Sequence, residues 1–173
     1  MRMKFKVVWE FSAWEREGLL WRYKTKNLIT TEGLNDVLTQ YFKGSAYTAG
    51  WYVGIVRSDN FGTFAAADVA SKIVTGVPGV GDNQWRESTA YTQGTRPALT
   101  LGSASMGSID NGASLATFNI NATLTLNGGF LSSSSTKGGT SGKLFGEALA
   151  VPPQNLVNTN ILTIKITILA AGA

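Results

Sequence analysis

Apolar and polar side chains alternate along the first 26 residues, which predicts a β-hairpin. The odd positions from 3 to 11 are apolar, while positions 2, 4, 6 and 10 carry charge. Successive side chains of a strand point to opposite faces, so this period of two indicates one buried and one exposed face. A polar bend at residues 15–18 precedes a second alternating run over residues 19–26. One face of the hairpin is therefore apolar and the other is basic.

A helical period follows the hairpin and predicts an α-helix over residues 30–43. Thr30 or Thr31 can supply the N-cap, and Gly44 is suited to end the helix. The apolar residues between them are spaced i, i+3, i+4 and i+7, as Leu34, Val37, Leu38 and Tyr41. This single stripe predicts that the helix covers one end or face of a sheet and that its apolar residues belong to the core.

Strand and turn signals follow one another along the rest of the chain. They predict a strand at residues 51–56, a long loop at 58–83 with one helical turn at 65–70, and antiparallel strands over 99–169. Within the last region we expect strands at residues 99–101 and 161–169, alternation over 113–126, and tight turns at 110–112 and 127–129.

These elements predict one mainly β domain over residues 1–173. The expected fold is an antiparallel β-sandwich, of which the jelly roll is one form, with an N-terminal β-hairpin over residues 1–26 and one short α-helix. No internal repeat and no domain-sized linker divides the chain.

The chain contains no Cys and no His, which removes common components of catalytic and metal sites. We therefore expect no enzymatic activity and no cofactor or bound metal. No apolar run approaches the roughly 20 residues that a membrane helix needs, so we expect a soluble protein that is made in the cytoplasm, with no membrane partner.

Two stretches imitate catalytic motifs without their structural context. Residues 134–137 fit the S-x-x-K pattern but lie in a loop rich in Ser and Gly. Residues 138–143 resemble a phosphate loop but lack its hydroxyl after the lysine. The acid pairs Asp59 with Asp68 and Asp82 with Glu87 lack the spacing of a metal loop. We expect loops at both stretches and solvated carboxylates.

All of the excess positive charge lies in the hairpin. Residues 1–26 contain seven basic and three acidic residues, an excess of four that equals the net charge of the whole chain. Two interpretations stay open: the basic residues protect an exposed sheet edge from aggregation, or they bind an acidic partner. The candidate partner-binding residues are then Lys4, Lys6, Arg22 and Lys24, together with Trp14.

Two further features bear on partners. Trp85, which is followed by Arg86 and Glu87, either packs in the core or anchors an interface with Arg86 beside it.

Residues 111–173 carry only four charged side chains, whereas a soluble domain normally has roughly a quarter or more of its surface charged. The second feature indicates a surface that neighbouring copies cover.

Several short segments resemble a group of small structural proteins encoded by tailed bacteriophages. The matching segments are 27–34 (NLITTEGL), 51–55 (WYVGI), 66–68 (AAD), 85–87 (WRE), Tyr91, 96–97 (RP), 130–139 (FLSSSSTKGG) and 142–145 (GKLF). The resemblance implies a virion component. Among such proteins, capsid cement or decoration proteins are similar in size and in their sandwich or jelly-roll build, and they often form trimers on the shell.

Composition and resemblance together predict a non-enzymatic virion protein, most similar to a capsid cement or decoration protein on the capsid surface. Its expected partners are the major capsid protein or other virion proteins and further copies of itself, as a homotrimer. We expect no nucleic-acid partner and no small-molecule substrate. The alternatives are a tail or tail-fibre component, and a carbohydrate or host-surface binding module that uses Trp14, Trp51, Tyr52 and Trp85 to stack on sugar rings.

Overall fold

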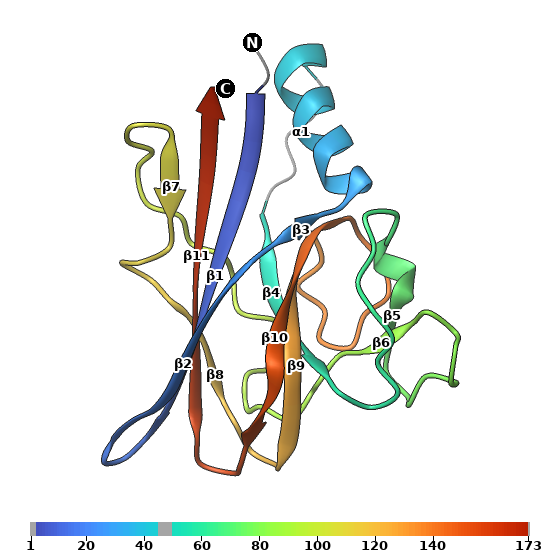
Figure 1. Cartoon of the computed structure of the whole chain (residues 1–173), viewed down its shortest axis with the longest axis vertical. Helices are drawn as coiled ribbons and strands as arrows, with labels where there is room; N and C mark the ends of the chain where they lie inside the picture. The colour runs from blue at the N-terminus through green and yellow to red at the C-terminus, as the bar shows by residue number, and fades with distance from the viewer. Residues whose placement is uncertain (1–2, 45–49, 173) are drawn as a thin grey trace.

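The structure, a computed structural model, describes residues 3–44 and 50–172, with the side chains of residues 5–44 and 50–170. Its strands form two main antiparallel sheets (Figure 1). The five-stranded sheet has the order β2-β1-β11-β7, and β8 also pairs with β11. Its strands are β1 (Met3–Glu15), β2 (Gly18–Lys26), β7 (Ser108–Asp110), β8 (Ala116–Asn119) and β11 (Ile161–Gly172).

The second sheet has four strands in the order β3-β10-β9-β4. They are β3 (Leu28–Ile29), β4 (Tyr52–Arg57), β9 (Leu124–Ser132) and β10 (Leu144–Leu156). The predicted mainly β fold with antiparallel strands, an N-terminal hairpin and one helix is confirmed and is consistent with a β-sandwich. The jelly-roll form of that fold stays a prediction.

The main core lies between the two sheets. The first sheet contributes the odd positions of β1, with Val7, Trp9 and Phe11 fully buried, as the period-two pattern predicted. The second sheet contributes residues such as Ile55 and Leu131 to the same cluster. Burying a large apolar side chain stabilises the fold by about 1.5–3 kcal/mol, so this layer is the main source of stability.

A further layer covers the outer face of the four-stranded sheet. We call residues 58–87 the covering layer; it holds a 3-10 helix, η1 (Ala70–Lys72), and the short parallel strands β5 (Ile73–Val74) and β6 (Trp85–Arg86). Figure 1 shows this segment in green beside β4 and β9, on the side away from β1 and β2. The predicted long loop at 58–83 is thus a packed layer. The helical turn expected at 65–70 is displaced: residues 65–68 make a single hydrogen-bonded turn, and the 3-10 helix begins only at Ala70.

This layer buries a second apolar cluster against the sheet. The cluster consists of Val56, Phe64, Ile73, Trp85, Phe130 and Leu144. The rings of Phe64 and Phe130 lie 5.5 and 5.0 Å from that of Trp85. The four-stranded sheet is therefore buried on both faces, whereas the outer face of the five-stranded sheet is open to solvent.

The helix α1 (Thr31–Lys43) has the predicted caps. The Thr30 hydroxyl accepts a hydrogen bond from the Gly33 amide at 3.0 Å, and Gly44 ends the helix in the left-handed region at φ 67°. The predicted burial of its apolar stripe holds only for Val37, which is partly buried against the core, whereas Leu34, Leu38 and Tyr41 are exposed. The helix packs through Gly33, where a Cβ would overlap the backbone of Phe145, and through Asp36.

Two predictions for the second half of the chain are also wrong. Residues 127–129 make no turn; they lie inside β9. Glycine is needed there because a side chain has no room: a Cβ at Gly129 would lie 2.7 Å from the Trp9 ring, and a Cβ at Gly128 would overlap the Ala148 carbonyl. The glycines allow close approach between layers. Residues 99–101 form no strand; Ala98 makes only an isolated bridge to Tyr52.

The position of the C-terminal strands explains why residues 111–173 carry so little charge. β9 and β10 lie inside the four-stranded sheet, and β11 lies between β1 and the short strands β7 and β8. Most residues of β9 and the first half of β10 are buried. Charged side chains are rarely buried without a partner. Burial within the fold therefore accounts for the low charge of residues 111–173, and covering by neighbouring copies is not needed to explain it.

Candidate interaction surfaces

Three basic residues of the hairpin share the outer face of the five-stranded sheet, and we call this the hairpin face. Lys6, Arg22 and Lys24 are exposed there, as predicted from their positions in the alternation. Glu10 lies among them, 3.4 Å from the Arg22 Nε and 2.8 Å from the Lys24 Nζ. This carboxylate neutralises part of the local positive charge. The side chain of the fourth predicted residue, Lys4, lies outside the described residues.

Trp14 belongs to the same face but is half-buried. Its Nε1 donates to the Thr163 hydroxyl at 3.1 Å. The ring lines a shallow pocket of about 170 Å³ together with Glu10, Ser12 and Arg22. The structure therefore brings Trp14 next to Arg22, one of the predicted basic residues.

Trp85 and Arg86 lie elsewhere, and of the two roles considered for Trp85, core packing or an interface anchor, the structure shows core packing. Trp85 is 1% exposed within the second apolar cluster. Arg86 donates to the Asp59 carboxylate at 3.0 Å and to the Thr75 carbonyl at 3.1 Å. Both residues thus hold the covering layer in place.

A buried ion pair ties the covering layer to the loop between β9 and β10. Glu87 and Arg96 are each 1% exposed, and two Arg96 nitrogens bind the Glu87 carboxylate at 2.9 and 2.7 Å. Arg96 also donates to the carbonyls of Ser134 and Gly139, and the Gly138 amide donates to Glu87. The expectation that Glu87 is solvated is wrong, because this network supplies the donors that a buried carboxylate needs.

The same loop explains the lysine of the S-x-x-K pattern. Lys137 Nζ donates to the carbonyls of Tyr91 and Gln93 at 2.6 and 3.1 Å and lies 4.0 Å from the centre of the Tyr91 ring. Partial burial lowers the pKa of Lys137. These contacts give Lys137 a structural role in fixing the loop. Only a weak sequence signal indicated that Glu87 is buried. Glu87 stands two positions after Trp85, so in an extended segment the two side chains lie on the same face.

Two buried carboxyl groups meet beneath the covering layer. Glu147 on β10 is 0% exposed and Asp68 is 1% exposed, so the expectation that Asp68 is solvated is also wrong. Burial, and then the neighbouring Asp68 carboxyl, raise the pKa of Glu147 to about 9. Asp68 accepts a hydrogen bond from the Ala65 amide at 2.9 Å. Near neutral pH Glu147 therefore carries a proton, which permits the two groups to be neighbours.

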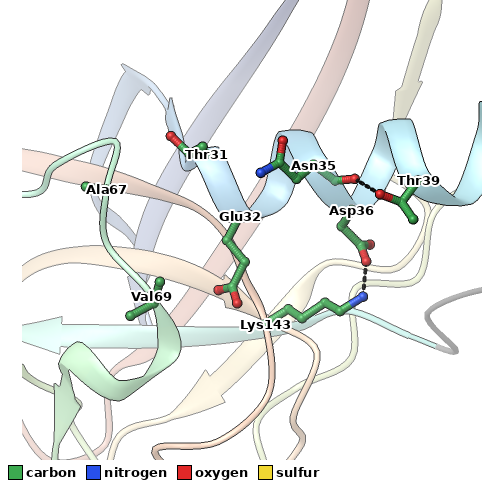
Figure 2. Close-up of a pocket in the computed structure, with 8 residues that line it drawn as sticks. All are labelled: Thr31, Glu32, Asn35, Asp36, Thr39, Ala67, Val69 and Lys143. Atoms are coloured by element: carbon green, nitrogen blue, oxygen red, sulfur yellow. Dashed lines mark hydrogen bonds and ion pairs between the residues drawn. The ribbon is translucent and has the colours of Figure 1, made fainter.

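A pocket of about 580 Å³ lies between α1 and the covering layer, with several polar and charged residues in its lining (Figure 2). Figure 2 shows Asp36 of α1 and Lys143 pointing toward each other, and they form an ion pair. Glu32 accepts a hydrogen bond from the Leu144 amide at 2.7 Å. The charged groups of this pocket therefore bind other parts of the protein, and their main effect is to hold α1 against the sandwich.

The opposite side of α1 presents exposed apolar residues, which we call the α1 apolar face. Its members are Leu34, Leu38, Tyr41 and Phe42, with exposed fractions of 38%, 52%, 81% and 71%. Beside them lies an apolar groove of about 200 Å³. Six of the residues that line it are Leu34, Val37, Trp51, Leu99, Leu101 and Ile168. Sequence reasoning identified the stripe but assigned it to the core.

Residues 3–44 and 50–172 contain no group of three or more acidic, Cys or His residues placed to hold a metal ion. No helix among those residues has the length and apolar character of a membrane span. No family model matches the chain, and no curated protein matches it.

Proposed function

We propose that this protein is a non-enzymatic structural component of a bacteriophage virion, and in particular a cement or decoration protein that stabilises the capsid shell by surface contacts. The observation that carries the proposal is the α1 apolar face. Contiguous exposed apolar surface on a soluble protein commonly marks a site of interaction. Tyr41 and Phe42, at 81% and 71% exposure, are large aromatic side chains of the type that anchor protein interfaces.

The hairpin face gives a second surface of different chemistry. Lys6, Arg22 and Lys24 project from a rigid sheet, and the hairpin holds the whole net charge of the chain. Such a face suits an acidic partner, which we propose is the major capsid protein or another virion protein. A specific interface buries about 1,600 Å² in total, and repeated contacts around a symmetric shell add avidity.

Particle binding tests the proposal. The double variant Lys6→Glu with Lys24→Glu reverses charge on the hairpin face, and Lys72→Glu on η1 is the matched control. We expect the double variant to lose occupancy on particles that lack the native protein, measured by co-sedimentation, while Lys72→Glu binds as the native protein does. Deleting residues 1–26 is not a usable test, because β1 is a central strand.

The outcome that overturns the proposal is specific. If the native protein never co-sediments with particles of the phage that encodes it, the virion assignment is wrong. Electron microscopy of particles carrying a label on this protein distinguishes the two virion locations: label on the head supports a cement protein, whereas label on the tail supports the tail or tail-fibre alternative.

The geometry disfavours the carbohydrate-binding alternative. A sugar platform needs aromatic rings on one exposed surface. Trp14 lies on the hairpin face, Trp51 lines the groove beside α1, and Trp85 is buried. These three tryptophans share no surface, so they form no common platform.

A further inference from the structure

The strand β2 has an open edge, because it is the end strand of the five-stranded sheet (Figure 1). The other long edges are protected. The outer edge of β4 is covered by a later segment, and there the Val53 amide donates to the Pro97 carbonyl at 2.8 Å. The half of β10 beyond its pairing with β3 contains Pro152 and Pro153, which have no amide to donate to a further strand. β2 is nine residues long and contains no proline, so it can accept one.

The main-chain groups on the open side of β2 belong to its basic residues. The Asn27 amide donates to the Val7 carbonyl at 2.8 Å, which makes these two residues a hydrogen-bonded pair of the β1–β2 ladder. In an antiparallel ladder such residues alternate with residues whose amide and carbonyl point away from the neighbouring strand. Along the register from Asn27, the groups of Lys24 and Arg22 therefore point to the open side, and those of Tyr23 point to β1. In the part of the chain that the structure describes, no backbone hydrogen bond joins Arg22 or Lys24 to another segment on that side.

The side chains of β2 differ in chemistry between the two faces of the sheet. Arg22 and Lys24 lie on the hairpin face, with side-chain exposures of 50% and 66%. Trp21 and Tyr23 lie on the inner face, where they are only partly buried against the main core. A β-bulge precedes Trp21, so the regular stretch of the strand begins at that residue. An added strand would therefore place its side chains alternately beside a cation and beside an aromatic ring.

From this arrangement we infer that β2 binds an extended segment of a partner protein as an additional antiparallel strand, in which acidic and apolar residues alternate. The inference rests on the proposed function, because the acidic partner of the hairpin face is the protein that supplies this segment. One acidic residue lies opposite Arg22 and another lies opposite Lys24, and each exchanges two main-chain hydrogen bonds with its basic neighbour. The apolar residue between them covers the exposed part of Tyr23. Main-chain bonds give such a contact its affinity, and the alternating side chains give it specificity.

Charge disfavours the β2 strand of a second copy as the occupant of this edge. In an antiparallel pair centred on Tyr23, Arg22 of each copy lies opposite Lys24 of the other. The cations of both copies then share one face, and the nearby acid, Glu10, already lies 3.4 Å from Arg22 and 2.8 Å from Lys24 of its own copy. Like charges directly opposite each other destabilise a sheet, whereas opposite charges stabilise it. The charges that oppose self-pairing therefore favour an acidic strand.

A synthetic peptide tests the inference on the native protein. The probe is a capped peptide with the core Val-Glu-Val-Glu-Val, and the matched control has Lys in place of both Glu. With a Kd of about 1 mM, about 2 mM probe fills roughly two-thirds of the sites and slows hydrogen exchange at the Arg22 and Lys24 amides about threefold. We expect this effect by NMR, with no change at the Tyr23 amide, which already points to β1. No protection of either amide at about 10 mM probe would overturn the inference. Equal protection by the Lys peptide would overturn the acidic character of the partner.

N-methylated peptides distinguish strand addition from simple attraction of charge. Methyl groups on the amides of the two Glu residues remove the donors that face β2, whereas a methyl group on the amide of the central Val points away from β2. We expect the first change to weaken binding at least about tenfold and the second to weaken it less than about threefold. Equal affinities of these two peptides would mean that charge alone holds the peptide on the hairpin face, and strand addition would be wrong.

Particle binding separates this inference from the proposed function. Lys24→Pro removes the amide on the open edge and Lys24→Gln keeps it, while both variants remove the same charge. Proline is tolerated on an edge strand where its nitrogen faces solvent, and an unchanged thermal unfolding midpoint confirms the fold. We expect Lys24→Pro to bind particles at least about tenfold more weakly than Lys24→Gln. Equal binding by the two variants overturns strand addition and leaves the virion assignment standing. A native protein that binds the peptide as inferred but never co-sediments with particles supports the edge site and overturns the virion assignment.

Discussion

The two outer faces of the sandwich use charged residues in opposite ways. On the hairpin face, Glu10 pairs with Arg22 and Lys24 in contact with water, with side-chain exposures of 50% for Arg22 and 66% for Lys24. On the other outer face, the covering layer encloses the Glu87–Arg96 pair, whose side chains are 0% exposed. The first face leaves charge available to a partner, and the second uses charge to fix the fold.

The two faces differ in how much stability is lost when one partner of an ion pair is removed. Exposed ion pairs contribute about 0–1 kcal/mol, because water and salt replace the partner. A buried pair adds little net stability over an apolar equivalent, but removing one partner leaves an uncompensated charge. Charge on the covered face therefore specifies how residues 58–87 and the loop after β9 are held, whereas charge on the open face can change with little effect on stability.

Breaking the buried pair is expected to give the largest effect. Arg96→Met leaves Glu87 without its cation and the carbonyls of Ser134 and Gly139 without a donor. We expect a loss of about 3–5 kcal/mol in the free energy of unfolding, measured by urea denaturation. Adding Glu87→Gln to Arg96→Met is expected to recover part of the loss. A loss below about 1 kcal/mol in the single variant would show that the covering layer does not depend on this pair.

The second effect is a dependence of stability on pH through Glu147. The pKa of its carboxyl group is about 9 in the folded protein, whereas the ordinary pKa of an exposed glutamate is 4.5. Between these values the folded state holds a proton that the unfolded state has released, so stability falls as pH rises. The slope from this group is about 1.4 kcal/mol per pH unit, or roughly 3 kcal/mol from pH 6 to pH 8.

Glu147→Gln provides the matched comparison for that titration. The variant keeps the shape of the protonated side chain and has no proton to lose, so its stability is expected to vary less between pH 6 and pH 8. The measurement is urea denaturation of both proteins at each pH. Parallel pH profiles for the two proteins would mean that Glu147 is ionised in the fold and that the account of the carboxyl pair is wrong.

The same contrast between open and covered faces explains which elements the sequence could predict. The hairpin and β11 have one face in the core and one in water, and their residues alternate accordingly; Ile164 and Ile166 are buried while Lys165 is partly exposed. β9 is buried on both faces, and from Asn127 onward its residues show no alternation. Its glycines at 128 and 129 allow close packing. From sequence alone, such a pair of glycines cannot be distinguished from the glycines of a turn.

Side-chain environment was harder to predict than secondary structure. The caps of α1 follow from local rules, but an amphipathic stripe does not identify what covers it, and the structure leaves Tyr41 and Phe42 exposed. The shared face of Lys6, Arg22 and Lys24 follows from strand alternation alone. The burial of Glu87 and Arg96 depends on contacts between segments 9 to 51 residues apart, which no local pattern records.

Lys137 gives a smaller effect on the covered side. Lys137→Met keeps most of the alkyl chain but removes the donor to the Tyr91 and Gln93 carbonyls. We expect a loss of about 1–2 kcal/mol in the free energy of unfolding, in the range for an unsatisfied polar group. Lys72→Met on η1 is the control and should change stability by less than about 0.5 kcal/mol. Equal effects of the two substitutions would mean that the lysine contacts add nothing.

The smallest effect is expected on the open face, where Glu10→Gln removes the carboxylate that Arg22 and Lys24 share. The expected loss is below about 1 kcal/mol at low salt and close to zero in about 1 M salt, where charges are screened within about 3 Å. The same change makes the hairpin face more positive, so binding to particles with an acidic surface should tighten while stability barely changes. A loss above about 2 kcal/mol would show that the hairpin face depends on its charges as the covered face does, and the distinction between the two faces would fail.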